Sequence, residues 1–378
     1  MAKCVLLSTF PLPYHLIGSW TNRYDYLLSQ SSQVDYLISP QPAGHHNEYK
    51  HIKYIYLKFG NRRGWTKYFY KYRYINYLKI VDSILIKEDK LILKVIDNVR
   101  LLKDLHGFLL NKGLRNRCRI VFSQHGYSYF FSSKEGVQFY EMADHLILLT
   151  KQSYEFEVGR YSYITSKISI LPNGVNSQKF YKLSKEEKNI KKEQLGYKGK
   201  KICLWLSQER PKKGLHILLE AWHKSKLRNL NDFVLIIIGT SNNEILGNIH
   251  YKGKIPNDQL PEWYQISDFY MFTSLVHEGF SLSLTEALKS GCTVIASELE
   301  PLPEILMHGE YGHLIPKPHN PDSWNDVLDL LADNKLPQIE FSRDELDKLY
   351  DLENWRIKMN ELIREEKQLF DRKSSFIK

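Results

Sequence analysis

Residues 278–297 read EGFSLSLTEALKSGCTVIAS, which predicts a loop, a helix and a buried strand in succession. Glu278 lies in the loop, and Glu286 lies on the helix eight positions later. This layout suits a sugar joined to a diphosphate, because a helix N-terminus offers N–H donors and a positive dipole to phosphate, and carboxylates accept hydrogen bonds from hydroxyl groups. The alternative is an ordinary strand-to-helix turn that carries two solvated glutamates.

Short apolar strands alternate with helical patterns along the whole chain, which predicts an α/β protein with parallel sheets. At 378 residues the chain exceeds the usual size of a single core, so we expect two domains. The segment 176–200 is rich in Lys, Glu and Asn and predicts the boundary. The expected strands lie near residues 3–9, 34–38, 91–97, 119–123 and 145–149, and then near 201–206, 233–238, 249–252, 269–272, 293–296 and 312–315.

The end of the chain predicts an amphipathic helix. From Asn354 onward, Trp355, Met359, Leu362 and Leu369 follow one another at helical spacing. We expect this helix to pack back on the first domain.

Positive charge is concentrated in the first half of the chain. The net charge is +10, with +11 on residues 1–170 and −1 on residues 171–378. Residues 50–79 hold nine basic residues and no acidic one, interleaved with aromatic residues. This mixture fits an anionic membrane surface or a single-stranded nucleic acid. The alternative is a solvated helix whose aromatic stripe belongs to the core.

Several functional classes lose support because their motifs are absent. The sequence has no phosphate-binding Gly-x-x-x-x-Gly-Lys-Ser/Thr loop, no Gly-x-Gly-x-x-Gly after the first strand, and no His-Glu-x-x-His. It has no Asp-x-Asp either, so we expect no metal and no cofactor. The four cysteines lie far apart, which favours a reducing compartment. We find no signal peptide and no run of about 18 apolar residues that would span a bilayer.

From residue 171 to residue 315 the sequence resembles the retaining, nucleotide-sugar-dependent glycosyltransferases of family 4, which have the GT-B fold. The resemblance implies two Rossmann-like, doubly wound domains that face each other across a cleft. We expect an N-terminal domain over residues 1–175, a donor-binding domain over 176–353 and a C-terminal helix over 354–378. The matching segments are LPNGVN at 171–176, RPKKGL at 210–215, GKI at 253–255, EGF at 278–280, EAL at 286–288 and GCTVIAS at 291–297.

The resemblance assigns roles to residues of the second domain. Lys213 looks like the family lysine that holds the donor diphosphate, and Arg210 is expected to assist it, although many relatives carry an arginine where this chain has Gln208. Glu278 matches the residue that faces the donor sugar, and Glu286 matches the one that binds the ribose hydroxyls. The expected donor contacts are completed by the backbone of Gly279, Phe280, Ser281 and Leu282 around the sugar and distal phosphate, and by Lys254 and Ile255 at the nucleobase.

The resemblance is weaker in the first domain. Gly18 stands where relatives place a glycine loop against the diphosphate, and the alternative is a plain helix-starting turn. His125 follows the strand 119–123, and in the family a histidine in this region binds the donor sugar. Imidazole can also transfer protons near neutral pH. Asp97 and Asn98 end the preceding strand and are expected to reach the acceptor.

These observations predict a transferase that moves a sugar from a nucleoside diphosphate to a glycan or lipid-linked acceptor with retention of configuration, with Glu278 and His125 as catalytic residues. We expect a role in cell-surface polysaccharide or lipopolysaccharide biosynthesis, at the cytoplasmic face of an anionic membrane and without nucleic acid. Lys213, Arg210 and helix N-termini would stabilise the leaving group. Two alternatives remain: a nucleotide-sugar epimerase of the same fold, and a noncatalytic module that binds membrane or nucleic acid.

Overall fold

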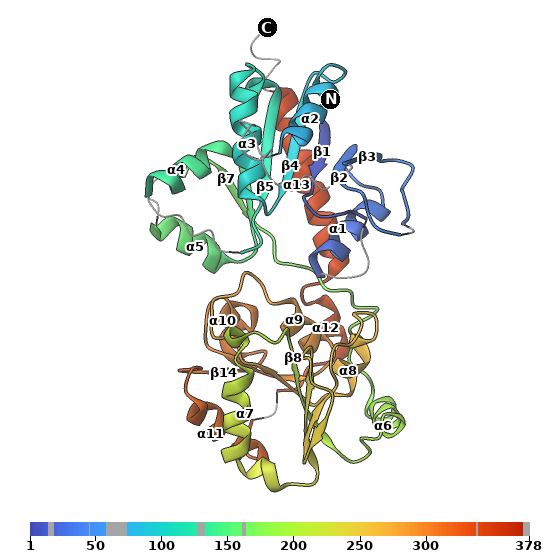
Figure 1. The fold of residues 1–378 in the computed structure, drawn as a ribbon, viewed down its shortest axis with the longest axis vertical. Helices are drawn as coiled ribbons and strands as arrows, with labels where there is room; N and C mark the ends of the chain where they lie inside the picture. Colours follow the sequence, from blue (N-terminus) through green and yellow to red (C-terminus); the bar gives the residue numbers. More distant parts are fainter. Residues whose placement is uncertain are drawn as a thin grey trace. The chain divides into compact units, whose positions relative to one another are not determined.

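The structure is a computed structural model that describes residues 1–13, 19–44, 46–57, 74–126, 133–160, 164–337 and 339–372 (Figure 1). The chain divides into two compact units. Unit 1 contains residues 1–172 and 353–378, and unit 2 contains residues 173–352. Each unit is an α/β domain built around a seven-stranded sheet. The prediction of two Rossmann-like domains is confirmed.

The sheet of unit 1 is entirely parallel, in the order β3-β2-β1-β4-β5-β6-β7. This is the doubly wound order, in which the direction of winding changes between β1 and β4. Its strands are β1 (Lys3–Leu7), β2 (Tyr36–Pro40), β3 (Lys53–Leu57), β4 (Leu91–Ile96), β5 (Cys118–Ser123), β6 (His145–Leu148) and β7 (Lys167–Ile170). Its helices include α1 (Ser19–Ser29), α2 (Ile75–Leu85), α3 (Val99–Asn111), α4 (Ser133–Met142) and α5 (Lys151–Arg160).

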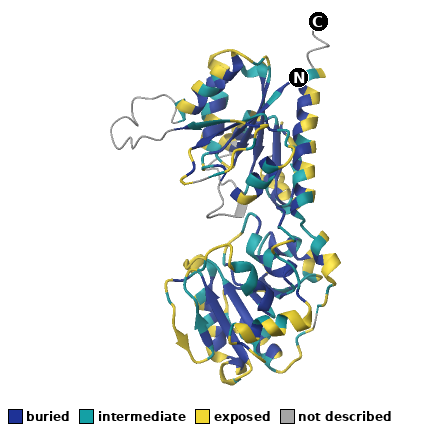
Figure 2. Cartoon of the chain, turned by 90° about the vertical axis from the view of Figure 1, so that its right-hand side faces the viewer, coloured by how far each residue is buried: buried dark blue, intermediate teal, exposed yellow. Residues whose placement is uncertain are grey.

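The predicted strands of unit 1 are all present, and the structure adds the two edge strands β3 and β7. Every residue of β4, at the centre of the sheet, is buried, and helices cover both faces (Figures 1 and 2). One cluster of aliphatic and aromatic side chains is contributed by the strands and by α2, α3 and α4. Such continuous burial is what a parallel sheet between two helical layers requires.

The last helix, α13 (Leu352–Arg372), belongs to unit 1, although the rest of that unit precedes unit 2 in the sequence. Trp355 and Met359 are buried as predicted, but Leu369 is 41% exposed. The buried side of the helix continues instead through Ile363, Glu366 and Phe370. The predicted face was wrong at its end because a charged residue, Glu366, takes a core position.

Glu366 is buried because β5 and β6 supply partners for its carboxylate. Its side chain is 1% exposed, and its oxygens accept hydrogen bonds from Arg119 Nε at 2.6 Å and from His145 Nδ1 at 3.0 Å. One turn of helix is thereby joined to two neighbouring strands. Burial raises the pKa of Glu366, but the hydrogen bond from His145 and the charge of Arg119 outweigh it and the net pKa is lowered.

The sheet of unit 2 has the order β10-β11-β9-β8-β12-β13-β14 and is parallel except for the β10–β11 pair. Leaving β10 aside, this repeats the doubly wound order of unit 1, with the change of direction between β8 and β12. The strands are β8 (Lys201–Leu206), β9 (Phe233–Ile238), β10 (Ile245–Leu246), β11 (Ile249–Tyr251), β12 (Phe269–Phe272), β13 (Thr293–Ser297) and β14 (His313–Ile315).

Helices cover the second sheet. They include α6 (Lys185–Gln194), α7 (Leu215–Lys224), α8 (Leu260–Ile266), α9 (Leu282–Lys289), α10 (Leu302–Ile305), α11 (Pro321–Ala332) and α12 (Arg343–Lys348). The core of this domain contains three fully buried tryptophans, Trp205 of β8, Trp222 of α7 and Trp324 of α11. The lysine-rich segment 176–200, which we interpreted as the boundary, contains α6 and lies inside unit 2. Lys188 and Lys192 of this segment make ion pairs with Asp268, so these charges attach α6 to the rest of unit 2.

Two predictions fall on residues that the structure does not describe. Gly18 and most of the basic and aromatic segment, residues 58–73, lie outside the described residues. In the described parts of the chain, no helix combines the length and the apolar character needed to cross a membrane.

Candidate functional site

The change of winding direction between β8 and β12 marks the candidate site in unit 2. In open α/β sheets, ligands bind at the carboxyl ends of the strands where the winding changes direction. The chain leaves β8 at Leu206, and the loop that follows ends in the 3₁₀ helix η3 (Pro211–Lys213) and Gly214 before α7 begins. The chain leaves β12 at Phe272 and reaches Glu278 six residues later. Lys213 and Glu278 thus come from the two loops that flank this point.

Gly214 allows the two loops to touch. Its φ is +71°, and a Cβ built on it would lie 2.0 Å from the backbone oxygen of Thr273. Two further contacts fix the loops together. The Thr273 hydroxyl donates to the carbonyl of Lys213 at 2.7 Å, and the N–H of Leu275 donates to the carbonyl of Lys212 at 2.8 Å. Glycine is therefore required at position 214, and the backbone of Lys213 is held in place by β12.

The Lys213 side chain pairs with the Glu278 carboxylate. Lys213 Nζ lies 2.6 Å from Glu278 Oε1, and the Ser274 hydroxyl donates to the same oxygen at 2.6 Å. The two charged side chains are 21% and 19% exposed, so the pair is mostly shielded but open to solvent on one side. A cation, a carboxylate and a hydroxyl therefore meet at one accessible point.

The segment from Gly279 to Leu282 leads from Glu278 into α9. Phe280 is buried against the edge of the Tyr350 ring, with the ring centroids 5.3 Å apart. Ser281 is the N-cap residue, and within the described structure its side chain makes no capping hydrogen bond. The first N–H groups of a helix have no partner within the helix, so α9 can offer donors to an anion next to Glu278.

Glu286 lies on the next turns of α9 and neighbours a buried pair of tyrosines. Burial, and then the neighbouring Tyr270 and Glu286, raise the pKa of Tyr264 well above its ordinary value. Tyr270 donates from its hydroxyl to the carbonyl of Leu206 at the end of β8, at 3.1 Å. Glu286 therefore lies near the carboxyl end of β8. Its neighbours are the two tyrosines, whereas Glu278 contacts Lys213 and Ser274.

The other predicted donor residues of unit 2 lie on separate loops. Arg210 is exposed and directly precedes η3. Lys254 is exposed and Ile255 is half-buried, in the loop after β11. This loop is joined to the loop after β9, because the N–H of Gly239 donates to the carbonyl of Gly253 at 2.7 Å. The structure thus brings Lys213 and Glu278 into contact and places the remaining residues on neighbouring strand ends.

His125 lies in unit 1, immediately after β5 (Cys118–Ser123) and Gln124. Its backbone N–H donates to the Asp97 carboxylate at 2.9 Å, which joins the ends of β4 and β5. Burial of the ring, and then the positive charges of Arg23 and Lys94, lower the pKa of His125 well below its ordinary value. The imidazole is therefore neutral at physiological pH, which suits a hydrogen-bonding role and not proton transfer near pH 7.

Asp97 and Asn98, which we expect to reach the acceptor, have structural partners. Asp97 has a φ of +42°, and burial raises the pKa of its carboxyl group. Asn98 caps α3 by accepting a hydrogen bond from the N–H of Leu101 at 2.8 Å. Its amide also donates to the Tyr74 hydroxyl at 3.1 Å. The geometry gives Asn98 a role in building the end of β4.

Ser274 and Thr273 also contribute to the site, although neither was among the predicted site residues. Ser274 contacts Glu278, and Thr273 holds the loop of Lys213 and accepts a hydrogen bond from Trp205 Nε1 at 2.9 Å. A signal was available, because both residues directly follow the strand 269–272 at its carboxyl end. That position is where polar side chains face a ligand in a parallel sheet.

Comparison with known families gives a match within the second domain. Residues 186–345 match the model of the family described as glycosyl transferases group 1, as the resemblance predicted. Phosphatidyl-myo-inositol mannosyltransferase of Mycobacterium tuberculosis is 26% identical over 156 residues, which cover 39% of this chain and 39% of that protein. The match thus spans about two fifths of that relative's length.

Comparison with solved structures covers nearly the whole chain and supports the GT-B fold. Sucrose-phosphate synthase from Thermosynechococcus elongatus aligns with a TM-score of 0.74 and 16% identity, over 98% of this chain and 100% of that one. Anabaena Alr3699/HepE in complex with UDP and glucose aligns with a TM-score of 0.70 and 16% identity, over 97% of this chain and 100% of that one. At this level of identity the likeness shows the fold.

Proposed function

We propose that this chain, whose residues 186–345 belong to the glycosyl transferases group 1 family, is a retaining glycosyltransferase that uses a nucleoside diphosphate sugar. The observation that carries the proposal is the contact between Lys213 and Glu278 at the change of winding direction in unit 2. A cation and a carboxylate at this position match the two halves of such a donor, which are an anionic diphosphate and a sugar rich in hydroxyl groups.

In the proposed mechanism Lys213 exchanges its partner when the donor binds. Without donor, its ammonium group is neutralised by Glu278. The diphosphate accepts hydrogen bonds from the Lys213 ammonium group and from the first N–H groups of α9. Glu278 then becomes available to accept hydrogen bonds from the sugar. As the bond to the sugar breaks, negative charge grows on the leaving diphosphate, and Lys213 and Arg210 stabilise it. His125, as a neutral imidazole, hydrogen-bonds the donor sugar.

The acceptor is proposed to be a glycan or a lipid-linked sugar in cell-surface polysaccharide or lipopolysaccharide assembly. The name of the mycobacterial relative, a mannosyltransferase acting on phosphatidyl-myo-inositol, supports a lipid-linked acceptor. The basic and aromatic composition of residues 50–79 supports an enzyme that works at the cytoplasmic side of an anionic membrane. Sedimentation with vesicles of phosphatidylglycerol, compared with vesicles of phosphatidylcholine, tests the membrane part.

Two measurements test the proposed activity. The first is a thermal-shift panel of UDP, GDP and ADP, in which one diphosphate should raise the melting temperature because it binds the native state. The second uses the sugar of that nucleotide and detects its transfer, with the anomeric configuration of the product read by NMR. Retention supports the proposal. No stabilising diphosphate, inversion of configuration, or isomerised donor without transfer would contradict it, and the last outcome would favour an epimerase.

A further inference from the structure

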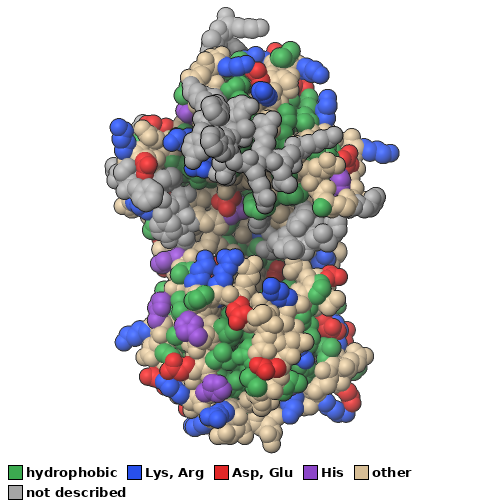
Figure 3. Space-filling model, in the orientation of Figure 1, with side chains coloured by type: hydrophobic (Ala, Val, Ile, Leu, Met, Phe, Trp, Pro, Cys, Tyr) green, Lys and Arg blue, Asp and Glu red, His purple; other side chains and the backbone are tan. Residues whose placement is uncertain are grey.

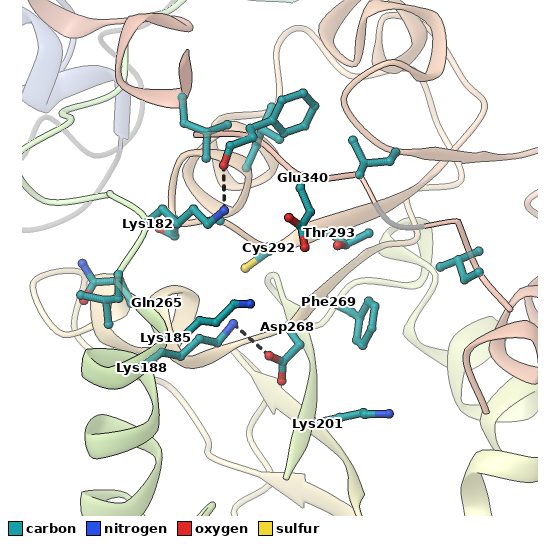
Figure 4. A pocket seen from close by; sticks show the side chains of 18 of the residues that line it. Lys182, Lys185, Lys188, Lys201, Gln265, Asp268, Phe269, Cys292, Thr293 and Glu340 are labelled. Carbon is teal, nitrogen blue, oxygen red and sulfur yellow. Dashed lines mark hydrogen bonds and ion pairs between the residues drawn. The ribbon is translucent and has the colours of Figure 1, made fainter. Parts of the chain in front are cut away.

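A cavity lies at the amino ends of the unit 2 strands, whereas Lys213 and Glu278 follow the carboxyl ends of β8 and β12. It has a volume of about 450 Å³ and is lined by the first residues of four parallel strands, Lys201 of β8, Phe233 of β9, Phe269 of β12 and Thr293 of β13 (Figure 4). Ligand pockets in proteins commonly measure about 300–1,000 Å³. The cavity is thus large enough for a small molecule and is separate from the proposed donor site.

Part of the cavity wall is apolar. Its apolar lining includes Phe233, Phe269 and Leu288 of α9, and Leu336 and Phe341 from the segment that follows α11. An apolar surface of this kind favours a ligand that has a hydrocarbon or aromatic body.

The polar side of the cavity is strongly basic. Five lysines line it, against the two acidic residues Asp268 and Glu340. Asp268 is already neutralised, because Lys188 Nζ lies 2.9 Å and Lys192 Nζ lies 2.6 Å from its oxygens. The remaining three lysines are Lys182, Lys185 and Lys201.

Against these three lysines the cavity lining holds one further carboxylate, Glu340, so the lining keeps a net positive charge. Lys182 donates to the carbonyl of Phe341 at 2.7 Å, and Lys201 donates to the amide oxygen of Asn334 at 2.7 Å. Both acceptors are neutral. Figure 4 shows the side chains of Lys182 and Lys185 extending from one side of the cavity toward Cys292 and Thr293. Elsewhere on unit 2 the surface is mixed, with acidic and basic side chains spread over the face drawn in Figure 3.

Lys182 is held by packing as well as by its hydrogen bond. Gly291, with a φ of +84°, ends α9, and a Cβ built on it would come within 2.6 Å of Lys182 Cγ. The aliphatic stem of Lys182 therefore crosses this glycine, and its ammonium group is positioned before any ligand arrives. Such preorganisation lowers the entropic cost of binding.

We propose that this cavity binds a small amphiphilic anion, a molecule with an apolar body and one phosphate or carboxylate group. The apolar body would lie against the strand ends and α9, and the anionic group would lie among Lys182, Lys185 and Lys201. The site is independent of the proposed transfer reaction, since it lies at the amino ends of the strands whose carboxyl ends carry Lys213 and Glu278.

The probes are alkyl phosphates, titrated into the full-length protein by isothermal calorimetry below their micelle concentrations. We expect one saturable site for octyl phosphate, with an affinity that falls about fourfold for each methylene removed in hexyl and butyl phosphate. Inorganic phosphate lacks the apolar body of the proposed ligand, and octyl glucoside lacks its anionic group. If either probe binds as tightly as octyl phosphate, the proposal is overturned.

Matched variants place the site. Lys185→Glu changes an exposed residue at the start of α6 and should weaken octyl phosphate binding at least about tenfold, and Lys201→Gln should weaken it as well. Lys358→Glu, at an exposed position on α13, makes the same change in net charge and should bind like wild type. Lys213→Met should also bind like wild type. Equal binding by Lys185→Glu and wild type, or loss of binding in Lys213→Met, would overturn the proposal, the latter by placing the probe at the donor site.

Discussion

Lys213 and Glu278 lie 65 positions apart in the sequence, yet the ammonium nitrogen of one is 2.6 Å from a carboxylate oxygen of the other. This contact exists because β8 and β12 are neighbours in the sheet although seven other elements separate them along the chain. It also means that a bound diphosphate and Glu278 compete for the same cation.

Replacing Lys213 by Met should weaken binding of the stabilising diphosphate by between about tenfold and about a hundredfold, because a charge-assisted hydrogen bond contributes about 1.5–3 kcal/mol. Calorimetric titration of the diphosphate measures the effect. Lys212→Met, at the exposed neighbouring position, is the control and should change the affinity less than threefold. Equal losses in both variants would indicate a general effect of surface charge instead of a phosphate contact.

Changing Glu278 or Glu286 to glutamine should have different effects on diphosphate binding and on sugar transfer. Glu278→Gln removes the carboxylate that competes for Lys213, so the diphosphate should bind as tightly as in wild type or a few-fold more tightly, while sugar transfer falls at least about a hundredfold. Glu286→Gln should instead weaken nucleotide binding. Paired measurements of kcat and the diphosphate Kd distinguish them, and wild-type transfer by both variants would refute the assigned roles.

Gly214→Ala should destabilise the protein and reduce diphosphate affinity together. The new Cβ would overlap the carbonyl of Thr273 and push the loop of Lys213 away from β12. Gly199→Ala is a matched control, since Gly199 has nearly the same φ, +70°, and nothing lies within 4 Å of its added Cβ. Gly199→Ala should lower the free energy of unfolding only by about 1–2 kcal/mol, which is what a left-handed backbone conformation costs alanine. If chemical denaturation gives equal losses for the two variants, the close contact at Gly214 is not what matters.

Lys94 should make the stability of unit 1 depend on pH in the alkaline range. This lysine is fully buried in β4, and burial lowers its pKa from 10.5 to about 7. Between these values the unfolded chain binds a proton that the folded chain does not, so the free energy of unfolding rises with pH from about 7 to about 10.5. Relative to Lys94→Met, wild type should therefore gain stability over this interval in urea titrations. Lys103→Met, on the exposed side of α3, controls for the lost charge, and parallel pH profiles of wild type and Lys94→Met would contradict the prediction.

Glu366→Gln should destabilise unit 1 by about 3 kcal/mol, because it leaves Arg119 and His145 without their buried carboxylate. Glu365→Gln, one residue earlier, removes a surface pair with Lys167 and should cost less than about 1 kcal/mol. Since the folded pKa of Glu366 is lowered, its stabilising effect is complete above about pH 4.5 and is lost as the pH falls below that value. Equal denaturation midpoints for the two variants would show that the buried contacts contribute little.

The central strands could be predicted from sequence because each is a short apolar run buried on both faces, as in FVLIII at 233–238. The edge strands β3, β7 and β10 were not predicted, whereas β14, at the edge of the unit 2 sheet, was expected near residues 312–315. β3 reads KYIYL and lies within a segment whose basic and aromatic residues resemble a surface helix, and β7 is only four residues long. Edge strands are half covered, so their sequences carry little of the apolar signal that identifies the centre of a sheet.

The candidate site was predictable residue by residue but not as a set of contacts. Glu278 stands out through its loop and Lys213 through the glycine that follows it, whereas the contact between them depends on which strands become neighbours. The position of Glu366 has the same origin. A glutamate on an amphipathic helix is expected in solvent, and only the arrival of Arg119 and His145 from two other strands makes a buried position favourable.

The placement of α13 in unit 1 affects how the protein folds during synthesis. Residues 1–172 leave the ribosome well before residues 353–372, and all of unit 2 is translated in between. The nascent first domain therefore lacks Trp355, which later packs against Tyr24 of α1, and Glu366, which later pairs with Arg119 and His145. Unit 2 has its whole sequence in one uninterrupted stretch, so a chain released after residue 352 would contain all of the second domain but a first domain without residues 353–372.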